Sequence, residues 1–345
     1  MKHLRRSFFL DLLRILACLM IVVMHAPMPT GEENSLFLSS LSYLTAPGIG
    51  LFFMLSGALL LPVKTDVKAF LKKRILKIAL PLLFWTGAFL FFRFWLHDEP
   101  VTWRAILSIP FSAQGNPVFW FLYTLLGLYL IAPILSRWVE KASCTELEFY
   151  LMIWAISLCY PLLRLVVEIN ASSTGILYYL SGYAGYFVLG YYLKTYPKRI
   201  HIKWFFPLVL IAYCAPVVCK LAGLHVDFYS VFWYLSIFVA IQSVFLWKLV
   251  FFLTPNHKDL APSSLIARLS RLTFGVYLIH YFIIRELLWN WTLIQEIRPY
   301  FLQTSVIILL AIIGSFAISG LIAHLRGARF LIGVEIPFRK PRGSS

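Results

Sequence analysis

The chain has 345 residues, of which 60% are hydrophobic, 17% aromatic and only 13% charged, and its mean hydropathy is +0.80. Soluble globular domains carry about 25% charged residues, so this composition excludes that class and indicates a polytopic membrane protein. The net charge of +16 is also found in nucleic-acid-binding proteins, but the distribution of the basic residues along the chain explains it differently.

Ten apolar runs are long enough to cross a bilayer, for which about 20 residues are needed. We therefore predict an all-α membrane protein, a polytopic bundle of about ten transmembrane helices that forms a single domain over residues 1–345. The expected spans lie near 8–28, 42–62, 76–96, 117–136, 148–168, 176–193, 204–222, 229–252, 273–292 and 303–324. The sixth is the shortest, and a tilted helix or a buried half-span is an alternative for it.

The connections between these spans alternate in charge. Basic residues precede the first span and follow every second span, with the densest group between Lys64 and Lys77, whereas the other connections carry Glu32, Glu33, Asp98 and Glu99. Lys and Arg gather on the cytoplasmic side of membrane proteins, so both termini are predicted to be cytoplasmic. Topology and contact with anionic membrane lipids account for the basic balance, and no nucleic acid is needed.

The first span carries three ionisable residues, Asp11, Arg14 and His25. Charged groups at membrane depth are costly and therefore often functional. On a helix Arg14 and His25 share one face, separated by about 16 Å along the axis, and Asp11 lies one turn before Arg14 as a ready ion-pair partner. We expect an ion pair near the inner surface and an imidazole near the outer one. An interfacial anchor with a capping histidine is the simpler alternative.

The second span contains Ser56 and Gly57 near its cytoplasmic end, where small residues permit close approach of another helix or of a ligand. The connection that follows, 70–81, holds the densest basic cluster, with Arg74 and Lys77. Such a cluster is a common topology signal, and it also suits the phosphates of a nucleotide-bearing donor such as acyl-CoA.

The fourth span opens on the outer side with Asn116, Trp120 and Tyr123. Aromatic residues at this level form either an interfacial belt or a surface on which a sugar ring can stack. The ninth span carries His280 about two turns inside the membrane from the cytoplasmic face. A structural hydrogen bond and a substrate contact are both open for this second imidazole.

Five segments in this order resemble the acyltransferase 3 family, bacterial integral-membrane O-acyltransferases that act on surface polysaccharides and related acceptors. They are Asp11-x-x-Arg14 followed after ten residues by His25, Phe-Phe-x-Leu-Ser-Gly at 52–57, Trp-Phe-Leu-Tyr at 120–123, the Gly/Tyr-rich stretch 182–193, and Tyr-Leu-Ile-His at 277–280. The family often has Arg-x-x-Arg after the second span. This chain has Arg74 and Lys77, so the second position keeps its charge and loses bidentate geometry.

The resemblance implies an O-acyltransferase of the bacterial inner membrane, most simply an O-acetyltransferase that uses acetyl-CoA and no metal. His25 would be the general base that activates a hydroxyl of a carbohydrate or lipid-linked sugar. Asp11 would orient Arg14, and Glu32 or Glu33 are candidates for stabilising the imidazolium. Residues expected to bind acyl-CoA are Arg14, Ser56, Gly57, Arg74 and Lys77. Residues expected to bind the acceptor are Asn116, Trp120, Tyr123 and His280.

Two other functions fit the same residues. A transporter or flippase of a lipid-linked sugar would line its path with Arg14, His25 and His280. A membrane regulator that binds a small molecule is the third possibility. Motifs for a nucleophile elbow, a P-loop, a dinucleotide site or a zinc site are not found, and the five cysteines have no metal-ligand spacing.

Overall fold

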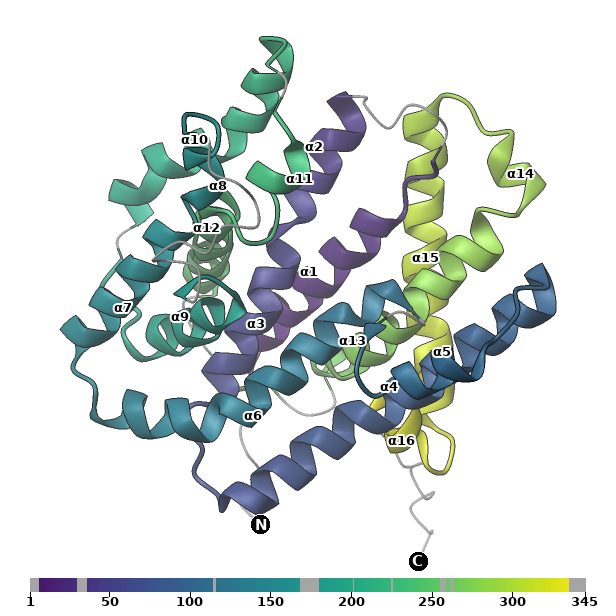
Figure 1. Ribbon diagram of the computed structural model, residues 1–345, viewed down its shortest axis with the longest axis horizontal. Coiled ribbons are helices and arrows are strands. Elements are labelled where there is room, and N and C mark those ends of the chain that lie inside the picture. Colours follow the sequence, from purple (N-terminus) through teal and green to yellow (C-terminus); the bar gives the residue numbers. More distant parts are fainter. Residues whose placement is uncertain are drawn as a thin grey trace, which may run out of the picture. The chain divides into compact units, whose positions relative to one another are not determined.

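The computed structural model describes residues 6–29, 36–113, 116–167, 180–200, 202–224, 226–254, 259–260 and 264–334. These residues are helical apart from turns, short connections and one antiparallel pairing between β1 (Arg6–Ser7) and β2 (Asp259–Leu260). The predicted all-α class is therefore confirmed (Figure 1). The chain divides into two compact units, Met1–Val67 with Leu130–Ala267 and Lys68–Tyr129 with Arg268–Ser345. That these act as a single domain stays a prediction.

The first unit is organised around α3, which packs against α1, α9 and α12 (Figure 1). A Cβ atom on Gly57 would lie 1.7 Å from the Phe187 carbonyl oxygen, and one on Gly190 would lie 1.8 Å from that of Met54. Glycine at both positions lets the backbones of α3 and α9 touch. The described helices of this unit are α1 (Phe8–His25), α2 (Leu36–Thr45), α3 (Pro47–Leu60), α7 (Cys144–Ser157), α8 (Tyr160–Leu163), α9 (Tyr183–Thr195), α10 (Ile202–Leu221), α11 (Phe228–Val231), α12 (Ile237–Leu253) and the second half of α6 (Trp120–Lys141).

The second unit is built around the long helices α4 and α15. The Trp85 indole donates a hydrogen bond of 2.8 Å to the Leu331 carbonyl and so ties α4 to α16, while α15 packs against α14, α16 and the π-helical segment 283–288, called the π-turn below. The described helices of this unit are α4 (Val67–His97), α5 (Trp103–Ser108), a 3₁₀ turn (Pro117–Phe119), the first half of α6, α13 (Leu265–Phe282), the π-turn (Ile283–Leu288), α14 (Thr292–Gln295), α15 (Tyr300–Ala323) and α16 (Ala328–Ile332).

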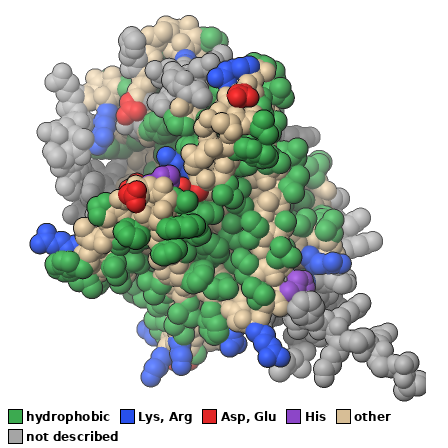
Figure 2. Space-filling view, turned by 90° about the vertical axis from the view of Figure 1, so that its right-hand side faces the viewer, with side chains coloured by type: hydrophobic (Ala, Val, Ile, Leu, Met, Phe, Trp, Pro, Cys, Tyr) green, Lys and Arg blue, Asp and Glu red, His purple; other side chains and the backbone are tan. Residues whose placement is uncertain are grey.

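The side chains of α15 show the polarity expected in a lipid environment. Gln303 and Ser315 are buried, whereas Leu309, Ile313 and Leu321 are more than half exposed. Polar groups in a bilayer face the protein interior and apolar groups face the lipid, which is the reverse of a soluble protein. Figure 2 shows hydrophobic side chains over a wide area of the face in view.

Six helical segments of the described chain are long and apolar enough to cross a membrane: Phe8–His25, Ser40–Leu60, Val67–His97, Pro117–Lys141, Cys144–Leu163 and Tyr300–Ala323. They correspond to six of the ten predicted spans. At the predicted sixth span, α9 has 13 residues, about 20 Å of helix, and most of its side chains are buried. This length and burial favour the buried half-span, which stays a prediction. The total of ten membrane spans and the cytoplasmic location of both termini stay predictions.

Two helices begin earlier in the chain than the predicted spans. The third span was expected to begin near residue 76, but α4 begins at Val67, so the basic cluster 70–81 is helical and not a connecting loop. Lys, Arg, Leu and Ala are good helix formers, and no breaker separates the cluster from the apolar run. The ninth span was expected from 273, whereas α13 begins at Leu265.

Candidate functional site

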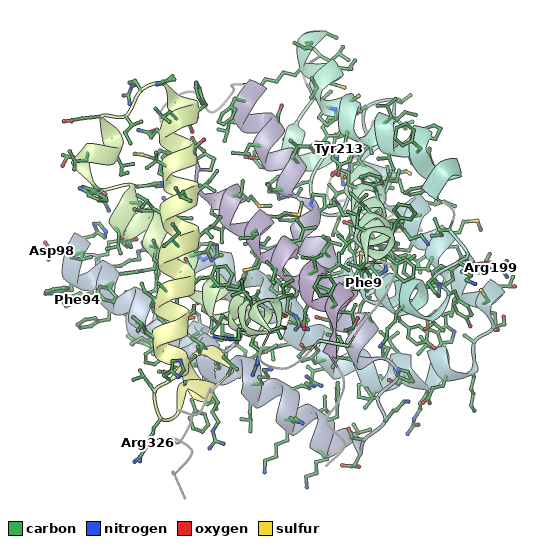
Figure 3. All side chains as sticks on the ribbon, turned by 180° about the vertical axis from the view of Figure 1, so that it is seen from behind. Phe9, Phe94, Asp98, Arg199, Tyr213 and Arg326 are labelled. Atoms are coloured by element: carbon green, nitrogen blue, oxygen red, sulfur yellow. The ribbon has the colours of Figure 1, made fainter. Side chains whose placement is uncertain are left out.

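The first helix brings Asp11 and Arg14 together as predicted. The Asp11 Oδ1 and Arg14 Nη1 atoms are 3.5 Å apart, and the two side chains are 6% and 28% exposed. The helix is fixed by Phe9, labelled in Figure 3, whose ring meets those of Trp247 and Phe251 of α12 edge-on at centroid distances of 5.2 and 5.4 Å. The charge pair is thus held on a helix that is anchored within its own unit.

His25 is the last residue of α1 and is half-buried. Its Nδ1 lies 2.8 Å from the Ile21 carbonyl oxygen. A carbonyl only accepts, so Nδ1 carries the proton and the lone pair of the neutral ring is on Nε2. The C-terminal end of a helix also favours a cation by about 0.3–1 kcal/mol, so it stabilises the imidazolium. The predicted partners Glu32 and Glu33 lie outside the described residues.

Tyrosine hydroxyls hold the end of α1 near His25. Tyr234 donates to the Met24 sulfur at 3.0 Å, and the fully buried Tyr186 of α9 donates to the Tyr234 carbonyl at 2.8 Å. Sequence reasoning noted the tyrosines of 182–193 only as packing residues, and it did not single out Tyr234. For Tyr186, the position in this Gly/Tyr-rich segment was the available signal.

Ser56 and Gly57 have local roles on α3. The Ser56 hydroxyl donates to the Phe52 carbonyl one turn earlier, at 2.9 Å, and Gly57 faces the backbone of α9. Close approach of a helix is therefore the alternative that the geometry supports for Gly57. Contact of either residue with a donor stays a prediction.

Lys194 of α9 contacts the end of α3, and Lys64, which follows α3 in the chain, lies nearby. The Lys194 amine donates to the Ala58 carbonyl at 2.5 Å, and burial together with the nearby charge of Lys64 lowers the pKa of Lys194. Two ammonium groups in proximity favour an anion between them. Sequence reasoning had counted both lysines only as topology signals.

The basic cluster of the second unit lies on the first turns of α4. Arg74 is half-buried, with its guanidinium carbon 6.0 Å from the centre of the Phe70 ring, whereas Lys77 is exposed. Their spacing of three residues puts both on one helix face. The arrangement suits phosphate groups, and their contact with acyl-CoA stays a prediction.

The predicted acceptor residues on the outer side have structural partners. Asn116 is buried, and its side-chain oxygen accepts from the Val118 amide at 3.3 Å, which caps the 3₁₀ turn before α6. The Tyr123 hydroxyl donates to the Ile109 carbonyl at 2.5 Å, and Trp120 is half-buried. Their contact with an acceptor stays a prediction.

His280 is fully buried in α13. Its Nδ1 lies 2.7 Å from the Tyr277 carbonyl, and the Tyr277 hydroxyl donates to the Val118 carbonyl at 2.6 Å. This network supports the structural alternative for His280. A role in substrate binding stays a prediction.

A family model described as an acyltransferase domain, acyltransferase 3, matches residues 7–324. The chain belongs to the acyltransferase 3 family. No curated protein and no solved structure matches it. Family membership and the apolar helices together indicate a multi-pass membrane acyltransferase and confirm the resemblance seen in the motifs.

The second unit of this acyltransferase also contains a cavity of about 420 Å³ that sequence reasoning missed. It lies where the end of α4 meets the end of α13 and the π-turn. Its lining consists of Phe89, Arg93, His97, Glu99, Pro117, Tyr281, Arg285, Glu286, Trp289 and Asn290. Arg93, Arg285 and Glu286 fall inside predicted spans, and charges at such positions were the signal that could have pointed to the site.

The ionisable groups of the cavity are paired with each other. The His97 Nε2 lies 2.8 Å from the Glu286 Oε2, and Arg93 is hydrogen-bonded to Glu99. Figure 3 labels Phe94 and Asp98, which flank this end of α4. The Arg285 guanidinium donates to the Tyr281 hydroxyl at 2.6 Å. Among the described residues, no group of three or more His, Cys, Asp and Glu could hold a metal ion.

Proposed function

We propose that the protein is a membrane O-acyltransferase, most simply an O-acetyltransferase, that moves an acyl group from acyl-CoA to a hydroxyl of a cell-surface carbohydrate or lipid-linked sugar. The proposal rests on the arrangement of helix α1 in a chain of the acyltransferase 3 family. The helix has the ion pair Asp11–Arg14 near one end and, at the other, His25, whose Nδ1 faces the Ile21 carbonyl and whose Nε2 is left as the base.

In the proposed reaction Nε2 of neutral His25 removes the proton of the acceptor hydroxyl. The oxygen then attacks the thioester carbonyl, the carbon–sulfur bond breaks, and the imidazolium returns the proton to the departing CoA thiolate. The products are an ester and CoA thiol, so atoms and charge balance. The end of α1 favours the transient imidazolium, and a positioned acid–base group of this kind contributes about 10²–10⁴-fold to the rate.

Donor binding is proposed on the side that the charge pattern predicts to be cytoplasmic. Within the first unit, Arg14 offers a guanidinium held by Asp11, and Lys64 with Lys194 offers a second cationic group for a phosphate. Arg14 and His25 are separated by about 16 Å of helix, which is comparable with the reach of a pantetheine arm. Arg74 and Lys77 of α4 are proposed as further phosphate ligands.

The test measures release of CoA thiol and acceptor-dependent transfer by purified protein given labelled acetyl-CoA. The variant His25→Ala is expected to lose about 10²–10⁴-fold in transfer rate with near-normal CoA affinity, because only proton removal is lost. His324→Ala is the matched control, since His324 follows α15 and is exposed. Retention of more than about a tenth of the wild-type rate in His25→Ala would rule out the general base. Movement of a sugar without consumption of acyl-CoA would indicate the flippase alternative.

A further inference from the structure

The cavity of the second unit has the size of a small-molecule site. Its volume of about 420 Å³ lies within the range of about 300–1,000 Å³ typical of ligand pockets. Part of its wall is the π-turn, which carries Arg285 and Glu286. π-Helical turns are rare and are found frequently at functional sites. A cavity and an unusual helical turn therefore occur at the same place as a cluster of charged residues.

The charges of this cavity cancel. Arg93 and Arg285 supply two positive charges, and Glu99 and Glu286 supply two negative ones, with His97 paired to Glu286. A site for an anion would have more Arg and Lys than Asp and Glu side chains in its lining, and a site for a cation would have the opposite excess. The balanced set in this cavity favours a ligand without net charge.

The same residues offer hydrogen-bond donors and acceptors in mixture. Carboxylates accept, guanidinium and amide groups donate, and an imidazole can do either according to its tautomer. Aromatic rings complete the lining: the Arg285 guanidinium carbon lies 4.7 Å from the centre of the Trp289 ring and 5.4 Å from that of Tyr281. A ligand that carries many hydroxyl groups and an apolar ring face matches both features.

We propose that this cavity binds an uncharged sugar ring of the acceptor. Glu286, fixed by His97, accepts hydrogen bonds from sugar hydroxyls, and Trp289 and Tyr281 provide the stacking surface. The cavity lies at the His97 end of α4, which the charge pattern predicts to face outward, where surface carbohydrate is found. That the bound sugar is the acyl acceptor rests on the proposed function. The inference that the cavity binds a sugar does not depend on the proposed function.

The experiment uses the full chain in nanodiscs without acyl-CoA. Saturation-transfer NMR and titration with methyl glycosides of neutral hexoses and deoxyhexoses are compared with methyl glucuronide. We expect saturation transfer to at least one neutral glycoside and weaker binding of the glucuronide. Glu286→Gln should weaken the neutral ligand about 10- to 100-fold, the loss expected for a hydrogen bond to a charged group. Trp289→Phe is a second, milder variant that should also weaken binding.

Trp291→Phe is the matched control, since Trp291 is 47% exposed and does not line the cavity. It should bind like the wild type, and all variants should keep the wild-type unfolding temperature within a few degrees. The proposal is overturned if no neutral glycoside binds, if the glucuronide binds better, or if the cavity variants leave affinity unchanged. Binding without any transfer from acyl-CoA would leave the cavity standing and refute the proposed function. Acyl transfer with sugar binding that the cavity variants leave unchanged would support the proposed function and refute the sugar site in the cavity.

Discussion

At the scale of single residues, His25 and His280 make the same type of hydrogen bond in two different surroundings. Each donates from Nδ1 to a carbonyl of its own helix, at 2.8 Å to Ile21 and at 2.7 Å to Tyr277. Both neutral rings thus carry the lone pair on Nε2. His25 is half-buried at a helix end, whereas His280 is fully buried within α13. Exposure, and not the tautomer, therefore makes His25 the better candidate for contact with a substrate.

The Asp11–Arg14 pair gives a prediction at this scale. Asp11→Asn should lower the free energy of unfolding by about 1–3 kcal/mol, because the partly buried guanidinium loses its charged partner. The double variant Asp11→Asn/Arg14→Gln should recover part of that loss, since no unpaired charge remains. Unfolding of the wild type, the single variants Asp11→Asn and Arg14→Gln, and the double variant in detergent measures the coupling. Strictly additive effects would mean that the pair contributes no interaction energy.

At the scale of elements, the crossing of α3 and α9 sets the shape of the first unit. Its closest point is made by Gly57 and Gly190, where an added Cβ would overlap the facing backbone. Backbone cannot move aside as a flexible side chain can, so the helices would have to separate. The small residues of these segments were visible in the sequence. Their pairing was not, because the contact joins positions far apart along the chain.

Gly57→Ala is expected to destabilise the protein by about 3 kcal/mol or more, at or beyond the upper end of overpacking costs. Gly127→Ala is the matched control. Gly127 lies within α6 and a Cβ there meets nothing within 4 Å. The control should be neutral or more stable by up to about 1 kcal/mol, because alanine favours a helix over glycine. Thermal unfolding and folded yield check both, and equal stability of the two variants would contradict the close crossing.

Local patterns predicted the long helices and the Asp11–Arg14 pair, since both depend on neighbouring residues. The start of α4 at Val67 was missed because charge was read as a loop signal, although Lys and Arg extend a helix well. The cavity was missed for another reason. His97 and Glu286 are 189 residues apart in the sequence, and no local pattern reports such a pairing.

At the scale of the whole molecule, the distribution of charge predicts how the chain crosses the membrane. The basic side chains of the first turns of α4 precede its apolar stretch, and His97 with its acidic neighbours follows it. The positive-inside rule then assigns the N-terminal end of α4 to the cytoplasm and the segment after His97 to the outside. The proposed donor and acceptor sites both depend on this orientation.

Labelling of introduced cysteines tests that orientation. Arg104→Cys and Lys72→Cys each replace an exposed residue, and the parent carries Cys214→Ser to remove the exposed native thiol. An impermeant thiol reagent on intact cells should label Arg104→Cys, because the segment after α4 is predicted to be outside, and should reach Lys72→Cys only after the cells are opened. The parent protein corrects for the remaining cysteines. The opposite pattern would place the cavity beside His97 on the cytoplasmic side. It would then be out of reach of a surface carbohydrate, and both the direction of acyl transfer and the identity of the sugar in the cavity would have to be reassigned.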